Sequence, residues 1–147
     1  MRRQQAQTLA LIDALLRIRH ELLYRLTPLP EIFTVLSGSR NREIADFFSQ
    51  LASMLSSMQA CTASYACRKA FAQTRGLCLS SAAQDTLLSL FDSLGKYDTE
   101  GSVQAIDLAL SRLREEAKAL QSGAAARCRT YLTLGICTGL AMAVILI

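Results

Sequence analysis

The chain has 147 residues, which is long enough for one domain with a modest core and too short for two. Two prolines and seven glycines leave few breaks, so the composition favours helices over strands and turns. The net charge of +4 comes from scattered basic residues with no aromatic platform beside them, so nucleic acid is not an expected partner.

The first predicted helix covers residues 4–26. Its apolar stripe consists of Leu11, Leu15, Ile18, Leu22 and Leu26, and is widened by Ile12, Leu16 and Leu23. Charges of alternating sign at four-residue steps mark a solvated face that carries Asp13, Arg17, Glu21 and Arg25. The helix is therefore expected to pack on one side only, with His20, the single histidine, exposed on its surface.

A segment with two prolines, residues 27–31, ends this helix and begins a short second one. Pro28 disfavours helical geometry at the residue before it, so Thr27 is expected to cap the second helix. Pro28 then takes the first helical position, and Glu31 complements the positive end of the helix dipole. This helix is predicted to end near Leu36, before a turn at residues 37–39.

Three further helices are predicted in the middle of the chain. The third covers residues 41–59, and its apolar side consists of Ile44, Phe47, Phe48, Leu51, Met54 and Leu55. The fourth covers residues 62–72, with Tyr65 and Phe71 as its bulkiest apolar contacts. Ser80 or Ser81 is expected to cap the fifth, which ends at Gly95 and presents Ala83, Leu87, Leu90, Phe91 and Leu94.

The sixth helix begins near Ser102 and carries an apolar seam with steps of three and four residues. The seam consists of Val103, Ile106, Leu110, Leu113, Ala117 and Leu120. It is about two and a half heptads long, shorter than a free coiled coil needs, and therefore predicts packing inside a bundle. The acidic residues on the other face, Asp107, Glu115 and Glu116, are expected to be solvated.

The chain ends in an uncharged segment, residues 130–147, which the sixth helix should enter with little interruption. As a helix it spans about 27 Å, close to the hydrocarbon thickness of a bilayer. Arg127 and Arg129 precede it, so residues 1–129 are predicted to form a cytoplasmic helical bundle and residues 130–147 a transmembrane helix in the cell membrane. The alternative for this segment is a buried core helix.

Within that segment, small residues recur every four positions, at Gly135, Gly139 and Ala143. Such a stripe allows another transmembrane helix to approach closely, which makes a homo-oligomer possible. Together the predicted elements describe an all-α protein, an antiparallel bundle of about five to six helices with a C-terminal transmembrane helix.

No pattern in the sequence predicts catalysis, a metal site or a cofactor. The pair Gly95-Lys96 lacks the glycine five residues upstream that a phosphate-binding loop requires. A catalytic triad would have to use His20, on a helix surface rich in charge. Five cysteines match no disulfide framework, and one distant histidine does not complete a zinc site. A thiol redox protein built on Cys61 or Cys67 is the weakest of the alternatives.

Three motifs together resemble the bacterial stage III sporulation protein AB family, from end to end of the chain. They are Glu21-Leu22-Leu23-Tyr24 followed by Thr27-Pro28-Leu29-Pro30-Glu31; Leu94-Gly95-Lys96-Tyr97-Asp98 leading into Gln104; and Leu134-Gly135 opening the segment that ends in Val144-Ile145-Leu146-Ile147. Members usually carry a further transmembrane helix before the basic pair that matches Arg2-Arg3, and they usually have serine where Tyr97 stands here.

The resemblance implies a cytoplasmic bundle similar to the platform proteins of type II secretion and type IV pilus machines. It implies a non-enzymatic role in the channel complex that joins mother cell and forespore, on the mother-cell side, with a cytoplasmic ATPase and other membrane proteins of the complex as partners. Thr27, Pro28, Pro30 and Glu31 belong to the most specific motif and are the candidate protein-interaction residues. The alternative is a tail-anchored tethering or adaptor protein unrelated to sporulation, whose seam should be longer and contain a polar layer.

Overall fold

The computed structural model describes residues 2–57, 62–96 and 98–147. These residues form helices and no strand, so the all-α prediction is confirmed. The helices are α1 (Arg2–Tyr24), α2 (Leu29–Leu36), α3 (Arg42–Ser56), α4 (Ala63–Gln73), α5 (Ser81–Leu94) and α6 (Thr99–Leu146).

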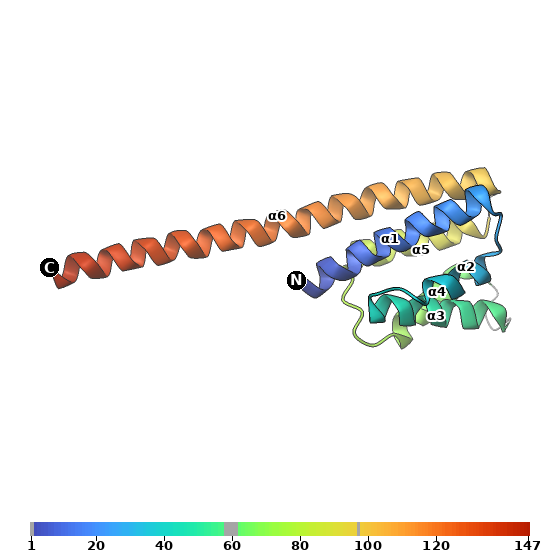
Figure 1. The fold of residues 1–147 in the computed structure, drawn as a ribbon, viewed down its shortest axis with the longest axis horizontal. Helices are drawn as coiled ribbons and strands as arrows, with labels where there is room; N and C mark the ends of the chain where they lie inside the picture. Colours follow the sequence, from blue (N-terminus) through green and yellow to red (C-terminus); the bar gives the residue numbers. More distant parts are fainter. Residues whose placement is uncertain (1, 58–61, 97) are drawn as a thin grey trace.

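The helices form two groups (Figure 1). α1 and α5 lie along the first half of α6 and run antiparallel to it, and α2, α3 and α4 pack together beside them. The second half of α6 continues well beyond the bundle. The N-terminus of α1, the start of α3 and the α4–α5 link lie at the end of the bundle that faces this extension, whereas the α1–α2 link lies at the opposite, distal end.

The predicted seam on α6 is buried against α1 and α5, which confirms its interpretation as bundle packing. Ile106, Leu110 and Leu113 belong to the same apolar core as Leu11 and Leu15 of α1. α5 contributes every apolar residue that the sequence assigned to its inner face.

An aromatic cluster joins the second group of helices to α5. The ring of Phe33 in α2 lies 5.8 Å from that of Phe48 in α3 and 5.6 Å from that of Phe91 in α5, measured between centroids. The rings of Phe47 and Phe71 of α4 stack with their centroids 5.0 Å apart, so Phe71 makes the apolar contact that was predicted for the fourth helix. Because aromatic rings bury a large apolar area each, this cluster adds an apolar link between the two groups to the packing of α4 on α5.

Tyr65 was expected in the core, and that prediction is wrong because its side chain is 55% exposed. The inner face of α4 is formed by Ala66, Cys67 and Ala70, which are all fully buried. These small side chains let α4 approach α3 and α5 closely, and Tyr65 lies on the other face.

Helix starts follow the capping rules closely. Asn41, Thr62, Ser80 and Asp98 each accept a hydrogen bond from the backbone N–H three residues later, at 3.0 to 3.3 Å. Ser80 rather than Ser81 therefore caps α5. The third helix begins one residue later than expected and ends at Ser56, while its predicted end at Gln59 lies outside the described residues.

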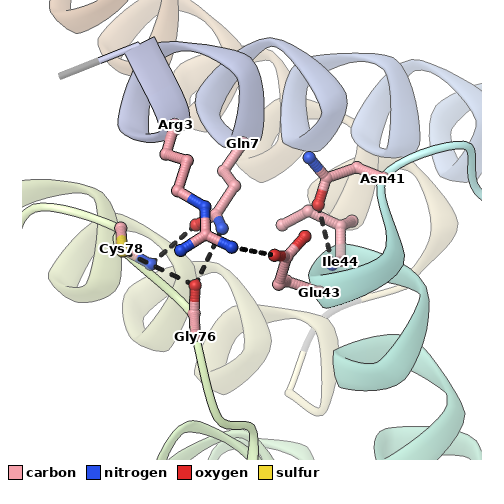
Figure 2. Close-up of polar contacts among 7 residues, drawn as sticks. All are labelled: Arg3, Gln7, Asn41, Glu43, Ile44, Gly76 and Cys78. Carbon is pink, nitrogen blue, oxygen red and sulfur yellow. Dashed lines mark hydrogen bonds and ion pairs between the residues drawn. The ribbon is translucent and has the colours of Figure 1, made fainter.

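A polar contact ties the α4–α5 link to the start of α1 (Figure 2). Gln7 is 1% exposed; its Nε2 donates to the Gly76 carbonyl at 2.9 Å and its Oε1 accepts from the Cys78 N–H at 2.6 Å. Arg3 reaches Glu43 of α3 at 3.4 Å beside it. Gly76 has φ +84°, a conformation that glycine adopts without strain.

Two of the three acidic residues expected to be solvated on α6 also have side-chain partners, although Asp107 is exposed as expected and Glu116 is partly buried. Arg19 Nε donates to Asp107 Oδ1 at 2.7 Å, and Ser80 Oγ donates to Glu116 Oε1. Glu115 is exposed as well. The Arg19–Asp107 pair also marks the antiparallel register of α1 on α6.

The apolar C-terminal segment is not a core helix. α6 is a single 48-residue helix, long and apolar enough in its second half to cross a membrane, and none of that apolar stretch is buried. The sequence alternative of a buried helix is therefore wrong, and the exposed apolar surface is compatible with a membrane anchor.

Candidate protein-interaction surfaces

The α1–α2 link forms the distal corner of the bundle, defined here as residues 24–31. α1 ends at Tyr24, two residues earlier than predicted, because the backbone turns sharply at Leu26. Leu26 therefore does not continue the apolar stripe of α1; its side chain is 71% exposed. Tyr24 is exposed too, so the corner carries two large exposed hydrophobic side chains.

Leu26 has φ +52°, the left-handed conformation that non-glycine residues rarely adopt. Such backbone strain costs on the order of 1 kcal/mol or more and tends to occur where function requires a particular geometry. A strained backbone that holds an apolar side chain in solvent makes the distal corner a candidate binding surface.

The four predicted interaction residues all lie in this corner, although their helix-capping roles differ from the prediction. Pro28 precedes α2 as its cap residue and accepts backbone hydrogen bonds from Glu31 and Ile32 at 3.1 and 3.2 Å. Pro30 lies in the first turn, where its missing N–H needs no partner. Thr27 does not cap α2 and instead donates to Glu21 Oε2 at 3.1 Å.

Thr27 therefore forms its hydrogen bond with the last turn of α1 and not, as expected, with the first turn of α2. Glu21 also meets Arg25 at 3.9 Å, so the end of α1 is closed by a small polar network. Glu31 remains exposed in the first turn of α2, where it complements the helix dipole as predicted.

A groove between α1 and α2 leads away from this corner; we call it the α1–α2 groove. Its first cleft has a volume of about 420 Å³ and is lined by Asp13, Leu16, Arg17, His20, Glu21, Ile32, Val35 and Leu36. A second cleft of about 580 Å³ adjoins it toward the α2–α3 link and shares Asp13, Arg17 and Leu36. His20 is exposed on the surface of α1, as expected, and its ring lies 4.8 Å from that of Tyr24.

The apolar side chains that line the groove include Leu9, Leu16 and Val35, of which the sequence assigned only Leu16 to the packed face of α1. Leu9, Leu16 and Leu23 are each about two-fifths exposed and recur every seven residues along α1. Val35 of α2 is 61% exposed. The spacing of the three leucines was the available signal for a second apolar face, since a strict seven-residue repeat marks one line along a helix.

The predicted packing stripe in the last part of α6 lies far from these surfaces (Figure 1). A Cβ atom added to Gly135 or Gly139 would meet nothing within 4 Å. Their face of the helix is open in the single chain, together with Ala143.

The described cysteines differ in accessibility. Cys67 is fully buried in α4, and burial raises the pKa of its thiol far above the usual range, against a smaller lowering by Arg68. Cys78, Cys128 and Cys137 are exposed free thiols, while Cys61 lies outside the described residues. Because the thiolate is the reactive form, Cys67 is poorly suited to redox chemistry.

A maleimide should therefore modify Cys78 rapidly in the folded protein and leave Cys67 unmodified until denaturant is added. The expected difference in rate is at least about a hundred-fold, because Cys67 must be exposed by unfolding before it reacts. Peptide mass spectrometry after timed labelling measures both sites in one sample. Equal rates at Cys67 and Cys78 would restore the thiol redox alternative.

Comparison with known proteins gives two matches that agree. The family model for stage III sporulation protein AB matches residues 1–147. A solved structure titled stage III sporulation protein AB is similar in fold, with a TM-score of 0.74 and 21% identity, over 82% of this chain and 94% of that chain. Among curated proteins, none matches the chain. Because the family model covers every residue, the chain belongs to the stage III sporulation protein AB family, and its role is in sporulation.

Proposed function

We propose that the chain is a non-enzymatic, membrane-anchored platform protein of the mother cell–forespore channel complex, anchored by residues 130–147. Its bundle lies in the cytoplasm of the mother cell, and the distal corner with the α1–α2 groove binds the cytoplasmic ATPase of the complex. Family membership supports the sporulation role and removes the alternative of an adaptor unrelated to sporulation.

The observation that carries the proposal is the position and chemistry of the groove. Leu16 and Val35 are exposed apolar side chains in a cleft that also contains Asp13, Arg17 and Glu21. An apolar centre with charges around it is the usual composition of a protein-binding surface. The first cleft of the groove begins beside the distal corner, at the bundle end farthest from the anchor, where a soluble partner meets least obstruction from the bilayer.

Val35→Glu should weaken binding of the ATPase at least about ten-fold, because a charge then has to be desolvated at the centre of the contact. The matched control is Leu108→Glu, which introduces the same charge at a similarly exposed apolar residue on α6. Biolayer interferometry with the immobilised chain in detergent measures both dissociation constants. Equal loss of affinity in the two variants, or no loss in either, would show that the groove is not part of the interface with the ATPase.

The same preparation tests the non-enzymatic part. Calorimetry with ATP should show no binding to the chain alone and binding only to its ATPase partner. Tight binding of ATP by the chain itself would contradict the proposal.

We also propose that the Gly135, Gly139 and Ala143 stripe packs against a transmembrane helix, either of a second copy or of another membrane protein of the complex. Small residues at four-residue steps allow close backbone approach, and nothing in the single chain covers Gly135 or Gly139. Cross-linking through Cys137, which lies between the two glycines, reports which helix is the neighbour.

A further inference from the structure

The end of the bundle that faces the apolar half of α6 carries five exposed arginines from three separate segments. These are Arg2 and Arg3 at the start of α1, Arg40 and Arg42 at the start of α3, and Arg75 in the α4–α5 link. The contacts of Figure 2 bring the three segments together, because Arg3 pairs with Glu43 and Gln7 holds Gly76. We call these five residues the arginine end.

Few carboxylates oppose these arginines. The nearby acidic residues are Glu43, whose side chain is mostly buried against Arg3, Asp46, one turn further along α3, and Glu116 of α6, which accepts a hydrogen bond from Ser80 after the α4–α5 link. The distal end has the opposite balance, with Glu21, Glu31, Asp92, Asp98, Glu100 and Asp107 against Arg19, Arg25 and Lys96. The bundle is therefore polarised along its length, basic toward the apolar segment and acidic away from it.

The register of α1 on α6 gives the height of Arg2, the member of the arginine end at the start of α1. Arg19 pairs with Asp107 and the two helices are antiparallel, so Arg2 lies level with position 124 of α6. Position 124 is six residues before the apolar segment begins at 130, which corresponds to about 9 Å along the helix. The headgroup layer on each side of a bilayer is about 5–8 Å thick, and the Debye length at physiological salt is about 8 Å.

We propose that the arginine end binds the phosphate groups of anionic phospholipids and holds the bundle against the membrane surface. The proposal rests on insertion of residues 130–147, which belongs to the proposed function. Lipid is favoured over an acidic protein because Arg2 lies within about one Debye length of the headgroup layer and the arginines come from three separate segments around the end of the bundle that faces the apolar segment. Guanidinium groups suit this role, since they pair with phosphate in a bidentate manner.

The sequence offers a clean reporter because it contains no tryptophan. Gln73 is exposed at the last turn of α4, beside the link that carries Arg75, and Gln73→Trp introduces a single fluorophore there. The full chain with this substitution is placed in nanodiscs that contain a lipid with a nitroxide-labelled headgroup, with or without phosphatidylglycerol. Quenching of the tryptophan then reports contact of the arginine end with headgroups.

Quenching should be at least roughly two-fold stronger with phosphatidylglycerol, because each basic side chain near an anionic surface raises its occupancy about five-fold. Changing Arg2, Arg40, Arg42 and Arg75 to Gln should abolish this difference, as should high salt. The control changes Arg17, Arg25, Lys96 and Arg112 to Gln, which alters the net charge equally but farther from the apolar segment. Circular dichroism confirms that both variants fold.

Carbonate extraction of the same chain separates failure of the anchor from failure of the lipid contact. If the chain is extracted, residues 130–147 are not inserted and both proposals are wrong. If the chain is retained but quenching is the same with and without phosphatidylglycerol, or falls equally in the control variant, the arginine end does not bind lipid. Unchanged quenching after loss of the four arginines would likewise overturn the proposal and leave an acidic protein as their partner.

Discussion

Replacing Leu140 with arginine should move the 147-residue chain from the membrane to the soluble fraction. Leu140 lies near the middle of residues 130–147, and its side chain is 62% exposed on α6. The segment has only enough length to span, about 27 Å, so it has little margin for a polar residue. Loss of an apolar side chain and gain of a cation should cost about 3 kcal/mol or more of insertion free energy.

Membrane flotation followed by carbonate and high-salt washing measures this effect. Leu140→Ala is the control for loss of the apolar side chain and should leave the chain in the membrane. Gly135→Leu should also insert normally, yet it places a bulky side chain on the small-residue stripe and should reduce helix–helix cross-linking. Full retention of the Leu140→Arg chain after washing would show that the anchor is elsewhere.

Phe33→Ala should lower the free energy of unfolding of the bundle by about 3–5 kcal/mol. Phe33 is fully buried and its ring contacts those of Phe48 and Phe91, so the substitution leaves a cavity where three helices meet. A loss of this size is a large part of the total stability of a small domain, about 5–15 kcal/mol. The variant should therefore unfold at a much lower urea concentration.

Urea titration of residues 1–129, followed by circular dichroism, compares the variant with two controls. Phe33→Leu keeps most of the volume and should cost about 1.5 kcal/mol or less. Val35→Ala, on the exposed side of the same helix, should change stability by no more than about 0.5 kcal/mol. A change below 1 kcal/mol for Phe33→Ala, or substantial strand content in residues 1–129, would contradict the fold described here.

Much of the fold was predictable because it depends on local periodicity. Ile106 and Leu113 recur at heptad spacing, and such a pattern requires a partner along one face wherever that partner comes from. Ser80 and Asn41 cap their helices through backbone groups three residues away, so the signal is entirely local. The apolar helix at the end of α6 is equally predictable, because its length and lack of charge depend only on its own residues.

Several features that the sequence did not predict depend on residues distant in sequence. Gln7 is buried because Gly76 and Cys78, some seventy positions later, satisfy its amide. Asp107 is paired because Arg19 lies opposite it. Apolar spacing alone also does not distinguish a core contact from an exposed one, so Leu16 and Leu23 were assigned to the core although they are partly exposed.

The candidate site was found only in part for the same reason. The corner with Thr27, Pro28, Pro30 and Glu31 was identified by its motif, whereas Val35 and the groove required the placement of α2 against α1. The spacing of Leu26 matches the apolar stripe of α1. No sequence pattern indicates its left-handed backbone conformation, which places Leu26 beyond the end of the helix.

With residues 130–147 inserted in the membrane as proposed, the continuous helix α6 acts as a rigid arm between the membrane and the bundle. No break separates the anchor from the helix that forms the seam of the bundle, so a change in tilt of the span is passed on as a rigid rotation. From position 130 back to Thr99 the arm is about 46 Å long, and a rotation of about ten degrees would displace the distal corner by roughly 8 Å. Transmembrane helices change their tilt when bilayer thickness changes. The lateral position of a docked partner would then follow the thickness of the membrane around the anchor.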